Sequence, residues 1–295
     1  MKLRAIIAGI LLSFIFIFVC YAQQDDFPVV KGPYLGQKPP GKTPEVFAPG
    51  IVSTEEFLEF SGTFTPDGKE YYFFRFADDA GMMVTKLSED GWTAPKPAQF
   101  NTKYIDNEPH ITSDGKYMFF NSNRPFPGFN GERILTQIWL MERSGDGWGE
   151  PKHLCAGMFV TSSKNGNIYL NDGITRLVNG KFAPFQKVAG ALNTPPEGWK
   201  LGRHSSISPD ESFLIFDTQK SDSELDADEN LFVCFRLRDG TWSKAFDLGD
   251  KLNLPGGKML ATISPDSRYL FLCSRGDIYW VDAKIIEELR PKELK

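Results

Sequence analysis

One short hairpin motif occurs five times in this chain. The copies begin at Gly62, Pro109, Met158, His204 and Leu260, and they read GTFTPDGKEYYFF, PHITSDGKYMFF, MFVTSSKNGNIYL, HSSISPDESFLIF and LATISPDSRYLFL. Their turn residues are Asp67, Asp114, Asn165, Asp210 and Asp266, at intervals of 47, 51, 45 and 56 residues. A unit repeated at this period is typical of the blades of a β-propeller.

The turn of the motif has a physical explanation. In the first copy, Pro66 presets the second position of a type I turn, and Gly68 accepts the backbone conformation of the fourth position. The aspartate between them can bond nearby backbone N–H groups, so we interpret it as structural rather than catalytic. Where Glu211 and Ser267 replace the glycine, we expect local backbone strain.

The strand after each turn is apolar at successive positions, as in YYFF (71–74) and YMFF (117–120). A sheet with one wet face would instead alternate apolar and polar residues. Continuous hydrophobicity therefore predicts sheets that are covered on both faces, as in blades stacked around an axis.

Further segments complete each unit. Third strands are expected over 82–87, 138–141, 174–178, 231–237 and 278–281. Four of them run into Asp-Gly or Asn-Gly hairpin turns followed by Trp92, Trp148, Phe182 and Trp242, which we expect to pack between blades. Short fourth strands are expected near 95–100 and 151–154.

The fifth unit has no fourth strand of its own, because residues 282–289 read as a short amphipathic helix that begins at Asp282. The segment from Pro44 to Phe47 resembles the missing strand. We therefore predict an all-β fold, a five-bladed propeller closed by pairing this N-terminal strand with the last blade; a sixth blade stays open.

The repeats resemble the Pro-Asp class of WD40-like β-propeller repeats, as found in the C-terminal domain of TolB periplasmic proteins. The Ser/Thr-Pro-Asp-Gly motif is complete at 65–68, partial at 208–210 and 264–266, lacks proline at 113–115 and is nearly lost at 163–166. The resemblance covers residues 44–291. It implies a fold and an exported location, and it implies no reaction.

The N-terminus is typical of a secretory signal peptide. Lys2 and Arg4 precede an apolar run that ends at Val19, and Ala22 suits a cleavage site. The run is short for a membrane anchor, and the bulky residues before Cys20 argue against lipidation. We expect a signal peptide over 1–22, a linker over 23–43 and a propeller over 44–295, located in the periplasm or secreted, with no transmembrane span in the mature form.

Composition excludes several classes of function. The net charge is −5 and there is no basic stripe, which argues against nucleic-acid binding. Cys155, Cys234 and Cys273 lie far apart and predict no disulfide framework, and three histidines give no zinc spacing. No cofactor is predicted. The stretch from Asp226 to Asn230 resembles the start of a calcium loop but lacks its glycine, so we favour a solvated loop over a cation site.

In a four-stranded blade, the start of the inner strand and the link between the second and third strands lie at the same end of the channel. His110 and His204 precede their turn residues by four and six positions and are expected near this rim, either bonded to neighbouring protein groups or in contact with a polar or anionic ligand beside arginines. The rim residues expected to bind a ligand are Glu59, Arg75, Glu108, His110, Arg124, Arg203, His204, Asp217 and Arg275.

Three functional classes follow from this rim. We favour a non-catalytic binding or scaffold module for an envelope protein or a glycan, because no pairing of a nucleophile with a base is visible in the sequence. The alternative is a carbohydrate-active enzyme that uses carboxylates at the channel mouth, with Glu59, Glu108, Asp172 and Asp217 as candidates. A metal-dependent hydrolase is disfavoured by the three histidines. No catalytic residue and no metal ligand is assigned, and the oligomeric state stays open.

Overall fold

The computed structural model describes residues 27–131, 135–170, 173–188, 195–223 and 229–294. The predicted signal peptide, Cys20 and its possible lipidation, Asn171, Asp172 and the Asp226–Asp228 part of the candidate calcium loop lie outside these residues. The side chain of Arg203 also lies outside the description.

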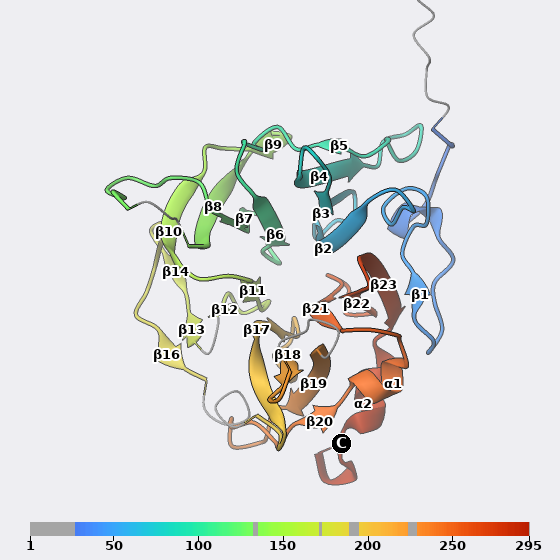
Figure 1. Cartoon of the computed structure of the whole chain (residues 1–295), viewed down its shortest axis with the longest axis vertical. Coiled ribbons are helices and arrows are strands. Elements are labelled where there is room, and N and C mark those ends of the chain that lie inside the picture. Colours follow the sequence, from blue (N-terminus) through green and yellow to red (C-terminus); the bar gives the residue numbers. More distant parts are fainter. Residues whose placement is uncertain (1–26, 132–134, 171–172, 189–194, 224–228, 295) are drawn as a thin grey trace, which may run out of the picture.

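The described chain forms five antiparallel sheets around one axis, and in each sheet the strand that precedes the repeated turn lies nearest the centre (Figure 1). Blade 1 contains β2 (Leu58–Phe64), β3 (Glu70–Phe76), β4 (Gly81–Lys86) and β5 (Lys96–Pro97). Blade 2 contains β6 (Asp106–Ile111), β7 (Tyr117–Ser122), β8 (Gln137–Ser144) and β10 (Lys152–Ala156), and β9 (Gly147–Trp148) also pairs with β8. Blade 3 contains β11 (Thr161–Ser162), β12 (Ile168–Leu170), β13 (Gly173–Thr175) and β16 (Gln186–Lys187), beside the hairpin of β14 (Leu177–Val178) and β15 (Lys181–Phe182).

The remaining two blades follow the same plan. Blade 4 contains β17 (Trp199–Ile207), β18 (Phe213–Lys220), β19 (Glu229–Phe235) and β20 (Phe246–Asp247). Blade 5 contains β21 (Met259–Ile263), β22 (Tyr269–Ser274), β23 (Asp277–Asp282) and β1 (Glu45–Val46). The predicted propeller is confirmed, with five blades rather than six.

The ring closes through β1, the earliest strand of the described chain. Glu45 lies opposite Trp280 and Val46 opposite Tyr279 on β23, and the backbone N–H of Phe47 donates to the carbonyl of Ile278 at 2.7 Å. Figure 1 shows β1 in blue beside β23 in red. The closure predicted from residues 44–47 is confirmed, and it covers the outer edge of the last blade.

The inner turns have the predicted construction. In blade 1, the hydroxyl of Thr65 donates to Asp67 at 2.6 Å, and Asp67 accepts the backbone N–H of Lys69 at 3.1 Å. Gly68 has a φ of 69°, and Glu211 and Ser267 adopt the same left-handed conformation at φ 61° and 63°. The aspartate is therefore a structural residue, and the two non-glycine turns carry the expected strain.

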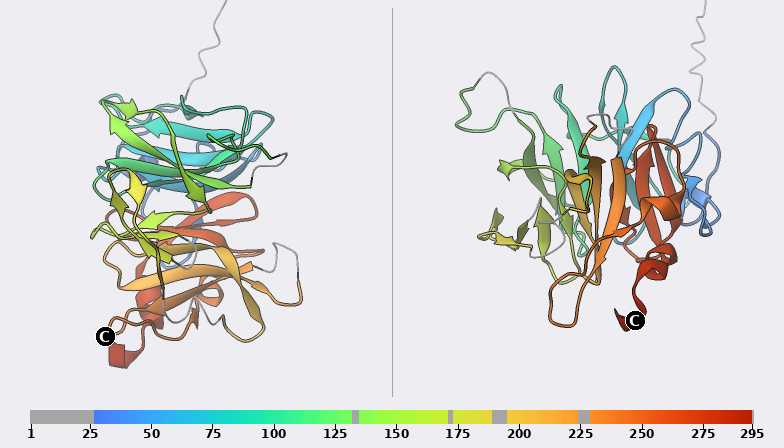
Figure 2. Two further views of the ribbon diagram at one scale, coloured as in Figure 1. Left: turned by 90° about the vertical axis from the view of Figure 1, so that its left-hand side faces the viewer. Right: turned by 60° about the horizontal axis from the view of Figure 1, so that its bottom comes forward.

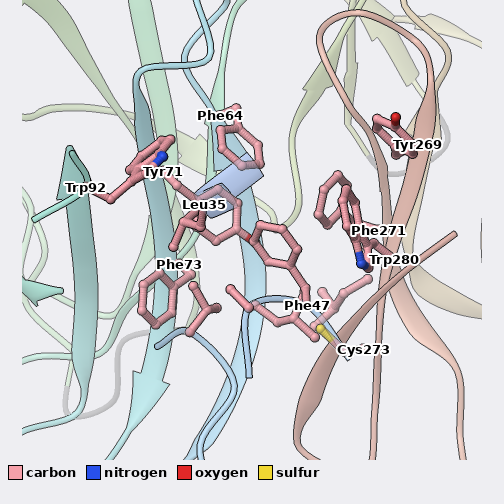
Figure 3. Packing of buried hydrophobic residues seen from close by; sticks show 14 of the residues in the cluster. Leu35, Phe47, Phe64, Tyr71, Phe73, Trp92, Tyr269, Phe271, Cys273 and Trp280 are labelled. Carbon is pink, nitrogen blue, oxygen red and sulfur yellow. The ribbon is translucent and has the colours of Figure 1, made fainter. Parts of the chain in front are cut away.

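Aromatic side chains fill the space between blades 5 and 1. Phe47 is fully buried and lies among Phe64 and Tyr71 of blade 1 and Phe271 and Trp280 of blade 5, with ring centroids 5.0–6.0 Å apart (Figure 3). Each of these rings removes a large apolar area from water, which is the main stabilising term of the interface. The segment that closes the ring through hydrogen bonds also anchors it through this packing.

The other interfaces add polar contacts to the same scheme. Arg143 of blade 2 forms a bidentate ion pair with Glu70 of blade 1 at 2.8 and 2.9 Å, and the indole N–H of Trp148 donates to the Tyr72 hydroxyl at 3.0 Å. Phe182 stacks on Phe119 of the preceding blade at 5.9 Å. Of the aromatic residues after the outer turns, Trp148 and Phe182 thus contact the preceding blade, as predicted, whereas Trp92 bonds the N-terminal segment.

Both ends of the described chain lie against the propeller. The N-terminal segment is held to blade 1 because the indole of Trp92 donates to the carbonyl of Gly32 at 2.8 Å. The C-terminal helix α2 (Lys284–Leu289) buries Ile285 and Ile286 in the cluster formed by blades 4 and 5 (Figure 2). Within the described ranges, none of the helices combines the length and the apolar character needed to cross a bilayer.

Candidate functional site

The propeller has two different faces. The turn face carries the five inner turns, whereas the opposite face, here called the mouth face, carries the starts of the inner strands and the links between second and third strands. The predicted rim residues whose side chains the structure describes lie toward the mouth face, except His110, which the structure places deeper in the channel. What the sequence does not predict is a break in the inner strands just below this face.

This break is a β-bulge at an equivalent position in successive blades. The pairing register shifts between Phe60 and Gly62, between Asn107 and His110, between Leu201 and Ser205, and between Met259 and Thr262. The residues six positions before the turn residue have left-handed φ values in four blades: 40° at Ser61, 51° at Glu108, 56° at Phe159 and 56° at Leu260. A bulge changes the direction of its side chain, and the fifth residue at this position is His204.

The residues at this position in blades 2 and 4, which lie in bulges, and in blade 3, where Phe159 precedes the inner strand β11, meet one another across the axis. The Nε2 atom of His204 lies 3.7 Å from Oε1 of Glu108, and the imidazole lies edge-on to Phe159 with ring centroids 5.1 Å apart. We call Ser61, Glu108, Phe159, His204 and Leu260, with Asn121 and Asp217 behind them, the mouth cluster. Three blades therefore contribute contacting side chains to one site.

Asn121 and Asp217 hold the two polar members of the mouth cluster in place. Both lie seven positions after their turn residues on the second strands, and both are about 1% exposed. Asp217 bonds Nδ1 of His204 through one oxygen and accepts the backbone N–H of His204 through the other at 3.0 Å. Asn121 donates its amide to Glu108 and accepts the backbone N–H of Phe159 at 3.2 Å. A Cβ at Gly202 would overlap the Asp217 carboxylate, so this carboxylate needs a glycine beside it.

The charges of the mouth cluster are coupled. Burial lowers the pKa of His204, but the adjacent Asp217 and Glu108 carboxylates outweigh it and raise that pKa to about 9. Burial also raises the pKa of Glu108 above its ordinary value, against the opposing effects of His204 and the Asn121 hydrogen bond. His204 is thus an imidazolium at neutral pH, held between two carboxyl groups.

Buried apolar side chains pack next to these polar groups. Phe159 and Leu260 are 3% and 6% exposed and belong to one buried cluster with Cys273 of blade 5. The Cys273 thiol accepts the backbone N–H of Ser61 at 3.2 Å, and burial raises the pKa of this thiol to about 12, so that it stays protonated. The Ser61 hydroxyl is buried and has no hydrogen-bond partner among the described residues.

Two of the predicted rim arginines form internal ion pairs. Arg75 bonds Glu59 at 2.8 Å, and Arg124 bonds Asp106 at 2.7 Å, with both carboxylates fully buried. Each guanidinium also stacks on aromatic rings of its own blade: Arg75 on Phe57 and Phe73, and Arg124 on Phe120 and Trp139. These pairs fix the loops that precede blades 1 and 2.

His110 lies deeper in the channel than His204. Its Nε2 atom is 2.8 Å from the Ser162 hydroxyl, and burial lowers its pKa to about 4, so the imidazole is neutral. It lines a cavity of about 50 Å³ near the turn face together with hydroxyls such as Thr63 and Thr262. The two histidines that the sequence places at similar positions therefore occupy different levels of the channel.

Arg275 remains on the mouth face. It is exposed, and within the described part of the chain no carboxylate lies within ion-pair distance of it. It lines a pocket between blades 5 and 1 that also contains Phe60 and Met259.

Sequence reasoning missed Ser61, Asp106, Phe159 and Leu260. The first, third and fourth occupy the same repeat position as Glu108 and His204, so counting back six residues from each turn would have found them. Asp106 is at the repeat position of Glu59. Among the described residues, no three His, Cys, Asp or Glu side chains form a group that could hold a metal ion.

Comparison with known proteins yields similarity to solved structures only. No family model matches the chain, and no curated protein matches it. Similar structures include a TolB from Agrobacterium tumefaciens (14% identity, 77% of this chain and 71% of that one, TM-score 0.43). They also include a gluconolactonase from Xanthomonas campestris (11%, 83% and 97%, 0.42) and a GH43 endo-arabinanase from Bacillus licheniformis (13%, 77% and 93%, 0.47). Similarity at this level assigns no activity.

Proposed function

We propose that this protein is an exported, non-catalytic binding module of the cell envelope, and that its mouth cluster binds a hydroxyl-bearing group of a glycan. The main support for this proposal is the space between the side chains of Glu108 and His204. Their facing atoms are 3.7 Å apart, which is too far for a hydrogen bond. The two side chains are 10% and 11% exposed, whereas the groups that hold them are buried.

A ligand hydroxyl suits this gap chemically. It can donate to a carboxylate oxygen of Glu108 and accept from the imidazolium of His204, because a hydroxyl is both donor and acceptor. The buried Ser61 hydroxyl supplies unused hydrogen-bonding capacity at the same level of the channel. Phe159 adds an apolar surface beside the polar pair, a combination typical of sites for small polar ligands.

The chemistry of the carboxylates favours binding over hydrolysis. A glycosidase uses two carboxyl groups that both reach the substrate. Here Glu59 is fully buried in its ion pair, and Asp217 is 1% exposed with both oxygens bonded to His204. Of the predicted carboxylates that the structure describes, Glu108 is the one with an exposed edge at the mouth cluster.

Glycan-array screening followed by calorimetry tests the proposal. We expect Glu108→Gln to weaken binding of any glycan hit about tenfold or more, because the substitution removes a charge-assisted hydrogen bond and one of the two carboxylates that raise the pKa of His204. Glu89→Gln, at an exposed outer turn, is the matched control and should bind as wild type. An array without hits, or a hit insensitive to Glu108→Gln, would reject the glycan assignment, and selective capture of an envelope protein would favour a protein partner instead.

A carbohydrate-active enzyme is the second candidate, favoured by the raised pKa of Glu108, which suits a general acid. A panel of chromogenic glycosides separates the two functions. The binding module predicts no turnover with any of them. Turnover that falls by roughly a thousandfold in Glu108→Gln, with binding retained, would establish the enzyme.

Export is part of the proposal and is supported by the basic residues Lys2 and Arg4, the apolar run after them and Ala22. The mature N-terminus after bacterial expression provides the test. We expect periplasmic or secreted protein that begins at Gln23. Cytoplasmic protein that retains Lys2 would show that this part of the proposal is wrong.

A further inference from the structure

A pocket on the mouth face lies between blades 5 and 1, beside the mouth cluster. It has a volume of about 350 Å³, within the range of small-molecule sites. Its lining is largely apolar, with Phe60 and Met259 as its large side chains, and Arg275 is its single charged residue. Cys273 lines this pocket and also contacts Ser61 of the mouth cluster, so the two sites are neighbours with different chemistry.

The backbone of Arg275 forms part of a tight turn at this pocket. Arg275 is the first residue of the two-residue turn that joins β22 to β23, where Ser274 pairs with Asp277. Arg275 and Gly276 both have positive φ values, 52° and 83°, as a type I′ turn requires. Asparagine and glycine adopt this conformation at lower cost, so the arginine is conformationally unfavourable at its position.

The guanidinium also has unused binding capacity. Arg275 is exposed, its side-chain stem lies along Gly256, and no carboxylate among the described residues is within ion-pair distance. Arg75 and Arg124, the other described arginines expected at this rim, already form ion pairs with Glu59 and Asp106. A planar guanidinium with five donors is suited to a carboxylate, which it binds through two parallel hydrogen bonds.

The surface around the pocket extends its apolar character. Leu58 and Phe76 pair across β2 and β3, are 47% and 54% exposed, and so form an exposed apolar pair. Leu58 also lies against Gly276 of the turn that carries Arg275. An arginine at the edge of an apolar surface fits a ligand with a carboxylate at one end and a hydrocarbon body.

We propose that this pocket binds a small apolar carboxylate, with the carboxylate on Arg275 and the hydrocarbon against Phe60 and Met259. This site is separate from the glycan-binding function proposed for the mouth cluster. Alkyl and aryl carboxylates share the required chemistry, and the probes below distinguish them.

Calorimetric titration with decanoate tests the proposal, with phenylpropionate as the aryl probe and decanol as the uncharged control. We expect one of the acids to bind at a single site, and decanol to bind at least tenfold more weakly. Arg275→Asn should weaken binding of that acid by roughly ten- to a hundredfold, since it removes a charge-assisted pair. Asparagine tolerates the left-handed backbone, so this variant should fold with unchanged or higher Tm.

Two further variants locate the site. Arg238→Gln removes an exposed arginine beside an outer turn and should leave acid binding unchanged. Glu108→Gln should also leave it unchanged, so a failed glycan assignment and a failed carboxylate site give different results. Absence of binding by both acids, equal binding of decanol, or full binding by Arg275→Asn would each overturn the proposal.

Discussion

The ring of Phe47 stands edge-on to the indole of Trp280, with ring centroids 5.2 Å apart and planes at 65°. Phe47 directly follows β1, the first strand, and Trp280 lies on β23, the last strand of the propeller. The contact therefore joins the two ends of the sheet array by packing, beside the backbone hydrogen bonds that pair β1 with β23.

Phe47→Ala tests the importance of this closure for stability. Removing a fully buried phenylalanine ring from the core should cost about 3–5 kcal/mol, because the cavity between blades 5 and 1 cannot collapse completely. Urea unfolding followed by tryptophan fluorescence measures the loss. Glu45→Ala, at an exposed position of β1 two residues before Phe47, is the control and should change stability by less than about 0.5 kcal/mol. Equal effects of the two substitutions would show that Phe47 does not anchor the strand.

The strained inner turns predict a stabilising substitution. Ser267→Gly should raise the free energy of unfolding by roughly 0.5 kcal/mol, because relief of the left-handed conformation exceeds the entropy that glycine gains in the unfolded chain. Gly68→Ser, at the equivalent position of blade 1, should lower it by about 1 kcal/mol. Thermal unfolding of both variants is the measurement, and a shift of the same sign in both would contradict the explanation.

The lowered pKa of Glu70 predicts that the stability of the protein depends on pH. Burial raises this pKa, but hydrogen bonds from Arg143, Lys86 and Tyr72 outweigh burial and hold the pKa at about 2, below its ordinary value of 4.5. The stabilisation is thus fully present above pH 4.5 and is lost as the pH falls toward 2. Because water reaches the ion pair and screens it, the stabilisation amounts to roughly 2–3 kcal/mol, below the full conversion of the shift in pKa.

Glu70→Gln should therefore destabilise the protein at pH 7 by a similar amount and flatten the loss of stability between pH 4.5 and pH 2. Urea titrations at several pH values in this interval measure both effects. Glu142→Gln is the control, because the Glu142–Lys152 pair is more than half exposed on the lysine side and should contribute little. If the loss of stability between pH 4.5 and pH 2 were the same in Glu70→Gln as in wild type, the Glu70 carboxylate would not be held by Arg143, Lys86 and Tyr72.

The repeat predicts the fold because each hairpin carries local signals that agree with the global arrangement. Three features follow from the sequence alone: the turn residues, the second strands that are covered on both faces, and the strand at residues 44–47 that completes the last blade. The first two depend on local residue types, and the third depends on counting the strands of each unit.

The mouth cluster could be predicted only in part. That Glu108, His204 and Asp217 lie toward the same end of the channel follows from strand direction alone, whereas their binding role stays a prediction. The bulges that bring Glu108 and His204 together were not visible, since Ser61, Glu108, Phe159 and Leu260 are not glycines and give no local sign of a positive φ. A bulge is fixed by pairing with the second strand and by packing across the axis, which are long-range contacts.

The arginines illustrate the same limit. Arg75 lies near the end of a second strand, Arg124 and Arg275 lie just after one, and the three look alike in sequence. Arg75 and Arg124 find a buried carboxylate, Glu59 and Asp106, at the start of the inner strand, whereas the corresponding residue of blade 5 is Lys258, which leaves Arg275 without that partner. The distinction depends on which side chain faces each arginine within the blade.

The proposed mouth site depends on an imidazolium held between two carboxyl groups, and the chain has three histidines. Their protonation can be followed individually by NMR of the imidazole rings, with assignment by substitution of each histidine. Burial lowers the pKa of His110 to about 4 and also lowers that of His153 below its ordinary value.

The titration of His204 tests this charge arrangement most directly. We predict a midpoint near pH 9, since Asp217 and Glu108 outweigh the effect of burial, and a lower midpoint in Glu108→Gln. A His204 midpoint at or below 6.5, unchanged by Glu108→Gln, would contradict the charge arrangement on which the proposed ligand site is built.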